Sequence, residues 1–508
     1  MVMAILLPAC GQSAPSSGEA SPSAGETVTI AFGGDVNLGR RQNAISARDG
    51  HAHALEGVPA LREADLAIVN LESVVSGIGT GGVEKGESGP FYFRGRPEML
   101  NVLLAAGIDA VGTANNHSGD YGPDALVDQA RLLDAAGIAH AGSGQDMHAA
   151  CAPTMLAAGD LVVGLVSVDA TMPHFAATDD APGTCHLDLA DSNAWRLRIG
   201  PALEEARRVA QVAVVAVHWG PNLATEPSEE KRAIGRLLVE LGADAVLGSS
   251  AHVLQGIEVH DGRPILHDAG NLLFDSQEGA VDSALFLLDV NANGVVGVRV
   301  EPLLSDYGVT AVAPAAGRDR ILGDLASMSA ALGTTLQGNG IAFDPPAREP
   351  PVAPAAVPER QPVATEPADE PPPGCVVDEM PAGLAGEPQD LGPLTFLGAR
   401  LEPQPVDGDR YASVESYWRV DAPVTEDLWL SPRLDSTGGG DTWRGDHEPC
   451  DWAWPTSRLQ PGVIYRDWVT LRPRDDPGPE LVLRVGVTDG EDTIELSGEL
   501  GRLPVADD

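Results

Sequence analysis

The stretch "DAVGTANNHSGDYG", residues 109–122, joins a short apolar run to two carboxamides and an imidazole. The apolar residues suit a buried strand, and the "SGD" at residues 118–120 suits a turn. Asn115, Asn116 and His117 therefore stand where a strand ends. A single histidine in such a place is more often structural than functional. The meaning of this stretch depends on what the other strands of the chain have at their ends.

Five more apolar runs end in a similar way. These runs, each with its terminal polar residue, are "TVTIAFGGD" with Asp35, "LAIVNLE" with Glu72, "VAVVAVHWG" with His218, "DAVLGSSAH" with His252 and "PILHDAGN" with Asn271. Between the runs, residues 123–138 and 228–243 repeat apolar side chains at the three- and four-residue spacing of helices. The alternation of strands and helices predicts an α/β domain.

Polar residues at six strand ends predict a common cleft. In a sheet covered by helices, ligands bind at the carboxyl ends of the strands. The side chains at these ends are carboxylates, carboxamides and imidazoles. Such a mixed donor set suits Mn, Fe or Zn better than Ca or Mg. We therefore expect a divalent metal site, with one or two ions, at this edge of the domain.

The overall composition limits the possible partners. The chain has 508 residues, a formal net charge of −42 and only two lysines, Lys85 and Lys231. A length of this order predicts two or three domains. So negative a protein repels phosphate backbones, and nucleic acid is excluded as an expected partner. The simplest account of the charge is solubility or salt tolerance.

The N-terminus is similar to a bacterial lipoprotein signal. A short apolar run leads to "LPAC", residues 7–10, followed by a tract rich in Ser, Pro and Gly. We interpret residues 1–10 as a lipoprotein-type signal segment with Cys10 as the lipid-bearing residue, and residues 11–26 as a flexible tether. A chance match is the alternative, because no positively charged segment precedes the run. The lipoprotein interpretation predicts export and membrane anchoring through Cys10.

Four further cysteines suit an oxidising compartment. Three pairings are possible, and the simplest joins Cys151 to Cys185 and Cys375 to Cys450. Residues 343–375 are rich in proline and acidic residues and predict an extended linker. This linker would separate a domain at residues 27–342 from a second one at residues 376–508.

The C-terminal residues predict an all-β sandwich. Short alternating runs are separated by Pro, Gly and Asp turns. Five tryptophans are concentrated here, namely Trp418, Trp443, Trp452, Trp454 and Trp468. They favour a tryptophan-rich core, and a carbohydrate-binding face is the alternative.

The strand-end motifs carry a family resemblance. In order they read "GD" at 34–35, "NLE" at 70–72, "ANNH" at 114–117 with "DYG" at 120–122, "HWG" at 218–220, "GSSAH" at 248–252 and "GN" at 270–271. Roughly residues 27–310 resemble the CapA family, the bacterial capsule (poly-γ-glutamate) synthesis branch of the calcineurin-like metallophosphoesterase superfamily. The resemblance implies a four-layer α/β sandwich with a binuclear metal cleft.

The resemblance also implies roles for individual residues. The metal ligands would be Asp35, Glu72, Asn116, His218 and His252, with Glu72 where the superfamily has a bridging Asp. His117 would be the general acid, a role that suits an imidazole beside metal ions. The residues expected to face a substrate are Asn115, Arg94 and Asn271. For Arg94 and its neighbour Arg96, pairing with surface carboxylates is an equal alternative. His174 and His267 also follow strands and are left as possible lining residues.

Two departures affect the expected site. Asn37 stands where the superfamily has a His ligand, and "GSSAH" replaces the family's common "GHHPH". Ser250 thus occupies a ligand position, and serine is a poor neutral ligand for these metals. We therefore expect one metal position to be weakened or lost, with the other kept by His218 and His252.

Two functions remain open from the sequence. In the first, the chain is an envelope factor for synthesis, export or anchoring of an extracellular polymer such as poly-γ-glutamate, working with other envelope biosynthesis proteins. In the second, it is a metal-dependent hydrolase of phosphoesters or polymer amide bonds. The Asn116–His117 pair favours chemistry on a small phosphoester or peptide-type substrate, whereas Asn37 and Ser250 favour binding.

Overall fold

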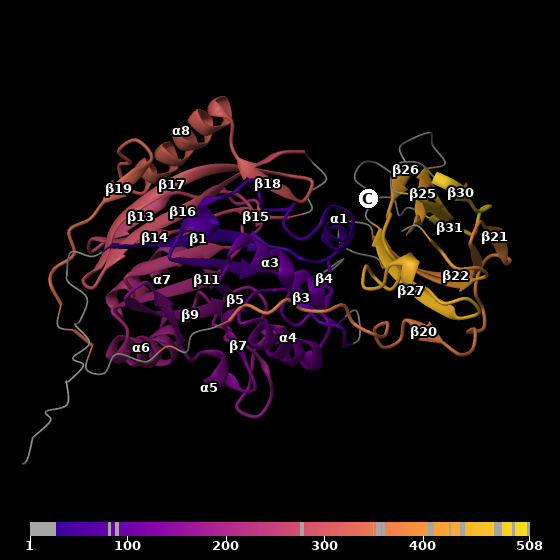
Figure 1. The fold of residues 1–508 in the computed structure, drawn as a ribbon, viewed down its shortest axis with the longest axis horizontal. Helices are drawn as coiled ribbons and strands as arrows, with labels where there is room; N and C mark the ends of the chain where they lie inside the picture. Colours follow the sequence, from indigo (N-terminus) through magenta and orange to yellow (C-terminus); the bar gives the residue numbers. More distant parts are fainter. Residues whose placement is uncertain are drawn as a thin grey trace, which may run out of the picture.

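The computed structural model describes residues 27–79, 83–86, 91–274, 279–348, 350–351, 357, 361–404, 411–425, 428–436, 442–471, 480–489 and 493–504. The predicted signal segment, Cys10 and tether lie outside these residues. The N-terminal part is mixed α/β, and the part after residue 375 is rich in β-strands (Figure 1). Within the described ranges, no helix is both long and apolar enough to cross a membrane.

Two sheets form the centre of the N-terminal part. The nine-stranded sheet has the order β18 (Val309–Val312), β17 (Gly294–Asp306), β16 (Val281–Asn291), β1 (Val28–Val36), β2 (Leu66–Leu71), β5 (Ala110–Gly112) and β6 (Ala139–Ala141), with β15 (Asn271–Leu273) beside β1 and β19 (Gly340–Ala342) beside β17. The six-stranded sheet has the order β13 (Ile257–His260), β14 (Arg263–Leu266), β12 (Ala245–Ser249), β11 (Val212–His218), β9 (Leu161–Asp169) and β8 (Thr154–Ala158). Strands β1, β2, β5 and β6 are parallel in the first sheet, and β9, β11, β12 and β14 in the second.

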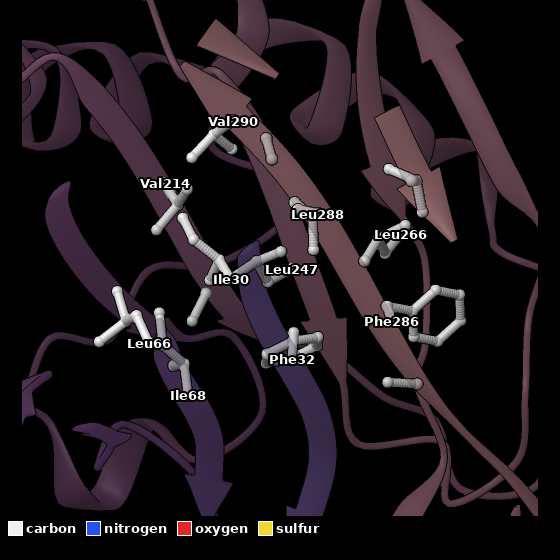
Figure 2. Packing of buried hydrophobic residues seen from close by; sticks show 14 of the residues in the cluster. Ile30, Phe32, Leu66, Ile68, Val214, Leu247, Leu266, Phe286, Leu288 and Val290 are labelled. Atoms are coloured by element: carbon white, nitrogen blue, oxygen red, sulfur yellow. The ribbon is translucent and has the colours of Figure 1, made fainter. Parts of the chain in front are cut away.

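The two sheets share one apolar core. In Figure 2, Ile30 and Phe32 of β1 lie in the same cluster as Val214 of β11, Leu247 of β12 and Phe286 of β16. Burying each such side chain stabilises the fold by about 1.5–3 kcal/mol. This shared core fixes how the edges of the two sheets line up.

Helices pack on the other face of each sheet. Apolar side chains of α6 (Ser192–Val209) and α7 (Glu229–Glu240) cluster with the six-stranded sheet, and those of α3 (Leu100–Ala106) and α4 (Pro123–Ala136) with the nine-stranded sheet. The helices predicted at residues 123–138 and 228–243 are confirmed as α4 and α7. The Ser228 side chain caps α7 by accepting the N–H of Lys231.

Further elements complete the N-terminal part. These are α1 (Arg41–Asp49), α2 (Ala60–Glu63), α5 (Met147–Ala150), α8 (Ala315–Ala331), the 3₁₀ helices η1 (Pro97–Met99) and η2 (Pro173–Phe175), and the ribbons β3 (Val74–Val75) with β4 (Arg94–Gly95) and β7 (Ser143–Gly144) with β10 (Gly183–Thr184).

The described residues of the C-terminal part form three sheets. Their orders are β20 (Val376–Val377), β27 (Ile464–Leu471), β23 (Tyr411–Val420), β22 (Leu394–Gln404) and β21 (Gln389–Leu391); β26 (Thr442–Arg444), β25 (Arg433–Ser436), β28 (Glu480–Arg484) and β31 (Gly501–Pro504); and β24 (Trp429–Leu430), β29 (Gly486–Thr488) and β30 (Thr493–Leu496). The helical turn η3 (Thr456–Arg458) lies between β26 and β27. Trp418, Trp452 and Trp454 are buried, as core residues would be.

The segment between the two parts lies against the N-terminal part. Its described residues from 343 to 375 contain no helix or strand. The N–H of Val363 donates to the Ala136 carbonyl at 3.1 Å, and the Thr365 hydroxyl donates to the Pro97 carbonyl at 2.8 Å. Disulfides join Cys151 to Cys185 and Cys375 to Cys450, which confirms the simplest predicted pairing.

One predicted strand is interrupted. The run at residues 264–271 is not continuous, because β14 ends at Leu266 and Asn271 begins β15. Asp268 lies between them and accepts the N–H groups of Ala251 and Gly270 at 2.8 and 3.1 Å. These bonds turn the chain from one sheet to the other. Asn271 is thereby placed in register with Asp35.

Candidate metal centre

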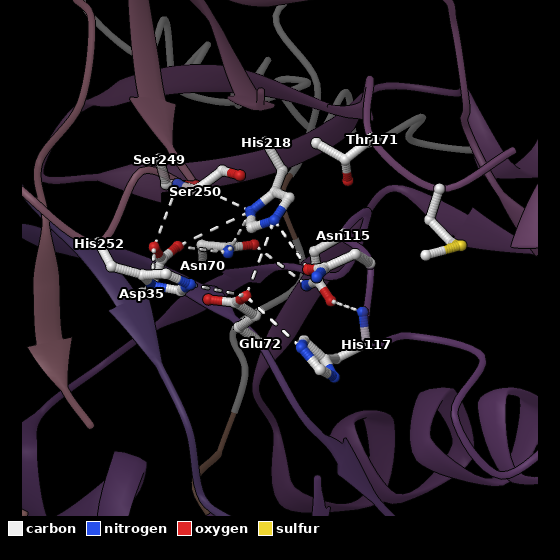
Figure 3. Close-up of polar contacts among 12 residues, drawn as sticks. Asp35, Asn70, Glu72, Asn115, His117, Thr171, His218, Ser249, Ser250 and His252 are labelled. Carbon is white, nitrogen blue, oxygen red and sulfur yellow. Dashed lines mark hydrogen bonds and ion pairs between the residues drawn. The ribbon is translucent and has the colours of Figure 1, made fainter. Parts of the chain in front are cut away.

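The polar residues of the strand ends converge at one place (Figure 3). Asp35 is near the end of β1, Glu72 directly follows β2 and His218 ends β11. Asn116 and His117 follow β5, and His252 lies three residues beyond β12. Because the strands are parallel and share a core, their carboxyl ends meet at one edge, as the sequence predicted.

Glu72 lies at the centre of this group. Its side chain is fully buried, and neither carboxylate oxygen has a hydrogen-bond partner. Imidazole nitrogens of His117, His218 and His252 lie 3.9, 3.8 and 3.7 Å from its Oε1. Burial, and then the charge of Asp35, raise the pKa of Glu72 well above its usual range. Buried polar atoms in proteins are nearly always paired, so these oxygens mark a position suited to a cation.

Asp35, Glu72 and His252 form a trio that can hold a metal ion. One ligand atom from each lies within 4.8 Å of the others. The Nδ1 of His252 is 2.9 Å from Asn271 Oδ1 and 3.3 Å from Asp35 Oδ2, while Nε2 faces Glu72. Metal-binding histidines usually have such an oxygen partner on the other ring nitrogen. Burial disfavours the charged ring, but Glu72 and Asp35 outweigh it and raise the pKa of His252 to about 10.

Asn116 and His218 approach Glu72 from another direction. His218 Nε2 is 2.9 Å from Asn116 Oδ1 and 3.8 Å from Glu72 Oε1. Two atoms bound to one ion at about 2.1 Å lie about 3–3.5 Å apart, which is close to this spacing. The Nδ1 of His218 faces Asn70 Nδ2 at 3.1 Å and Ser249 Oγ at 3.3 Å. Burial lowers the pKa of His218 to about 4, which favours the neutral ring that binds metals.

His117 is held by a buried ion pair. Its Nδ1 lies 2.7 Å from Asp120 Oδ2, and Lys85 Nζ lies 2.7 Å from Asp120 Oδ1. The Phe93 ring packs on the imidazole with centroids 4.1 Å apart. Burial lowers the pKa of His117 to about 4. With Nδ1 engaged by Asp120, Nε2 faces Glu72 and is the nitrogen that can exchange a proton at the site.

The loop between β12 and His252 has an unusual backbone. Ser250 has φ 105° and His252 has φ 60°, values that residues other than glycine rarely adopt. The N–H of Ser250 donates to Asp35 Oδ2 at 3.1 Å, so its backbone contacts the candidate ligand. Conformations of this kind cluster at functional sites. The Asn37 side chain also has a structural bond, because its Oδ1 accepts the N–H of Gly39 at 2.7 Å.

Three residues expected to face a substrate have different surroundings. Asn115 is buried and donates to the Leu71 carbonyl, while its Oδ1 accepts the N–H of His117. Asn271 accepts from His252, as described above. Arg94 is 2% exposed, and its guanidinium lies 3.8 Å over the Tyr121 ring. Each of these three groups thus has a partner within the protein, and its direct contact with a substrate stays a prediction.

The ion pairs around the site could not be predicted from the strand-end pattern. Both lysines of the chain are buried there, Lys85 with Asp120 and Lys231 3.8 Å from Asp268. Asn70 was also missed, although its Nδ2 donates to Asp35 Oδ1 at 2.7 Å. The signal available in the sequence was the rarity of lysine, since the only two lysines of the chain are candidates for specific positions.

His174 and His267 do not join the group. His174 is exposed in η2. His267 is buried with Nε2 3.0 Å from Glu258 Oε2, and Glu258 also accepts bonds from Arg232 and Arg236. Burial opposes the charge of Glu258, but bonds from His267 and the two arginines lower its pKa to about 2.

Replacing Glu258 with Gln should destabilise the protein at neutral pH by about 3 kcal/mol. A depressed pKa contributes stability that is present above the unfolded value of 4.5 and is lost as the pH falls toward about 2. The difference between wild type and variant should therefore shrink from pH 7 to pH 3. Urea unfolding at both pH values measures it, and an equal difference at the two would contradict this account.

Comparison with known proteins gives the family. Residues 29–276 match the family described as "Bacterial capsule synthesis protein PGA_cap". These residues belong to the CapA family. The CapA match includes every strand end that contributes to the candidate metal centre, and the C-terminal part lies outside it.

Three relatives that match these residues have descriptive names. "PGA biosynthesis protein CapA" of Bacillus subtilis is 26% identical over 280 residues, 54% of this chain and 71% of that protein. "Capsule biosynthesis protein CapA" of Bacillus anthracis is 26% identical over 279 residues, 54% and 67% of the two chains. A probable polyglutamine synthesis accessory protein of Mycobacterium tuberculosis is 31% identical over 228 residues, 42% and 57%.

Proposed function

We propose that this chain is a cell-envelope factor in the synthesis, export or anchoring of an extracellular polymer of the poly-γ-glutamate or capsule type. Membership of the CapA family and the names of its relatives support this role. The same proposal includes export, a lipid anchor on Cys10 and work beside other envelope biosynthesis proteins. It also includes a four-layer, metallophosphoesterase-like domain at 27–342, a linker at 343–375 and an accessory β-sandwich at 376–508.

The proposed functional site is a divalent metal site. The proposal rests on the buried carboxylate of Glu72. A fully buried carboxylate with two unpaired oxygens and three imidazole neighbours fits a metal ligand. We propose two ion positions that share Glu72, one with Asp35 and His252 and one with Asn116 and His218. The donor set suits Mn, Fe or Zn. Each position would have three donors from this chain. Ser250 contacts Asp35 through its backbone N–H, and one position is still expected to be the weaker, so the site would hold one or two ions.

The chain's own residues would orient the His117 ring and exchange protons at this site. When bound, such an ion polarises a phosphoryl or acyl oxygen and lowers the pKa of a water molecule. Asp120 and Lys85 fix the His117 ring, so that Nε2 can hold or accept a proton beside Glu72. The net charge of −42 repels a polyanion, so we propose brief contact with the polymer.

Hydrolysis of phosphoesters or polymer amide bonds is the second candidate function. The His117–Asp120 pair favours it, because an imidazole with a fixed ring orientation is of little use to a site that only binds.

A deletion strain complemented with variants tests the main proposal. Wild-type protein should restore the extracellular polymer, measured as cell-bound γ-linked glutamate, and Glu72→Gln should restore less than about a tenth of it. As a control, Western blotting should show that the wild-type and Glu72→Gln proteins are equally abundant in the cells. Full restoration by Glu72→Gln would show that the function does not need the metal site. An unchanged amount of polymer in the deletion strain would refute the role in polymer production.

A further inference from the structure

The two parts of the chain meet in a buried cluster next to the candidate metal centre. The cluster consists of Arg94, Arg96 and Tyr121 from the N-terminal part and Glu448 and Asp451 from the C-terminal part. We call these five residues the interdomain cluster. Residues 121 and 451 are 330 positions apart in sequence, so their contact is a product of the tertiary fold and not of local structure.

The contacts in the interdomain cluster are polar and buried. The Tyr121 hydroxyl donates to the Asp451 carboxylate, and the Arg94 guanidinium lies 3.8 Å over the Tyr121 ring. Arg96 forms an ion pair with Glu448, and its Nη2 donates to the Trp452 carbonyl at 3.2 Å. Tyr121 is 1% exposed and Glu448 is fully buried. Removing one partner of a buried pair leaves the other uncompensated, so this contact resists opening.

The interdomain cluster continues directly into the support of His117. Tyr121 follows Asp120, whose carboxylate binds the His117 ring and the Lys85 ammonium. Arg94 follows Phe93, whose ring packs on His117 and whose N–H donates to Asp120 Oδ2 at 2.8 Å. The two residues that hold His117 thus each have a chain neighbour in the interdomain cluster.

The C-terminal side of the contact has a specialised backbone. Cys450, Asp451 and Trp452 have φ values of 61°, 56° and 67°, three successive left-handed residues without a glycine. Such conformations persist only where the surroundings enforce them, and they cluster at functional positions. The N–H of Asp451 donates to Asp467 Oδ1, and His447 Nε2 lies 2.9 Å from Asp467 Oδ2. These bonds hold the Asp451 turn on its own sheet.

We propose that the C-terminal part completes the candidate metal centre: Asp451, acting through Tyr121, is a positioning residue for the loop at 115–121 that includes Asn116 and His117. This inference rests on the proposed metal site and extends it. It gives the C-terminal part a role within the protein itself, as the support of a loop whose small displacement would move a candidate ligand.

The test uses the full chain with Asp451→Asn, Tyr121→Phe and a control, Asp421→Asn. Asp421 is an exposed aspartate of the C-terminal part that pairs with Arg419. Hydrogen–deuterium exchange of the peptide covering residues 113–122 is measured without metal, and Mn²⁺ affinity is measured by calorimetry. Both cluster variants should exchange faster in this peptide and bind Mn²⁺ about tenfold more weakly. The control should match the wild type in both measurements.

The outcomes separate this inference from the proposed function. A wild type that binds no Mn²⁺ would refute the metal site, while the exchange measurement would still decide whether Asp451 holds the loop. A cluster variant with wild-type circular dichroism, unchanged exchange and unchanged Mn²⁺ affinity would overturn the inference. Tyr121→Phe removes only a hydroxyl, so it decides the matter if Asp451→Asn does not fold.

Discussion

Replacing Glu72 with Gln should abolish Mn²⁺ binding and leave the metal-free protein about as stable as the wild type. The Glu72 oxygens are buried without a hydrogen-bond partner, and burial raises the pKa of the carboxyl well above its usual range. A buried carboxylate that lacks hydrogen bonds is costly to a fold, so its replacement by a neutral amide should change the stability little when no ion is present. Saturating Mn²⁺ at about 100 times its Kd should stabilise the wild type by about 2.7 kcal/mol and the variant not at all.

Calorimetric unfolding of the full chain with and without Mn²⁺ measures this difference. The matched control is Asp169→Asn, another fully buried carboxylate, whose oxygens accept bonds from Thr171, Met172 and His186. Its loss should cost about 1–3 kcal/mol in the absence of metal and leave the gain from Mn²⁺ in place. Should Glu72→Gln keep the Mn²⁺-dependent gain, Glu72 is not a ligand.

The sequence located the candidate site because strand ends are a topological property. Asp35, Glu72 and His218 each end an apolar run, and parallel strands that share a core bring their carboxyl ends to one edge. This convergence depends only on the direction of each strand and not on side-chain geometry. It therefore placed His252 correctly as well, although this residue lies three positions past its strand.

Strand direction alone does not give the partners of each side chain. Arg94 lies on the two-residue strand β4, and its guanidinium packs on Tyr121. Asn115 and Asn116 are adjacent, yet Asn115 bonds to the backbone of Leu71 whereas Asn116 meets His218. Residue type and position alone do not distinguish these cases. Burial and pairing do, and they depend on the whole fold.

Polar pairs between residues far apart in the chain also could not be predicted from the sequence. Lys85 comes from a loop without regular structure, and its partner Asp120 lies 35 positions away. Asp451 is further still from Tyr121 and belongs to the part of the chain outside the CapA match. Such pairs have no periodic pattern. They follow from the packing of elements that are each predictable, which is why the fold could be foreseen and the support of His117 could not.

Replacing His218 with Ala should weaken Mn²⁺ binding by more than about 100-fold, whereas His117→Ala should leave it almost unchanged. His218 Nε2 lies 2.9 Å from Asn116 Oδ1 and also faces Glu72, the spacing of atoms that share an ion. His117 faces Glu72 alone, at 3.9 Å, and its other nitrogen is bound to Asp120. Each histidine thus serves as the control for the other.

Elemental analysis of the purified proteins, followed by calorimetric titration with Mn²⁺, decides between these roles. Equal metal content in wild type and His218→Ala would refute the second ion position, and loss of metal in His117→Ala would make His117 a ligand. Mn²⁺-loaded proteins are then assayed on phosphoesters and on γ-glutamyl peptides. If the wild type hydrolyses either one, His117→Ala should be at least about 100-fold slower, because general acid–base catalysis contributes about 10²–10⁴ in rate. A metal-loaded wild type that hydrolyses neither class rules against the hydrolase and leaves the binding role in polymer synthesis.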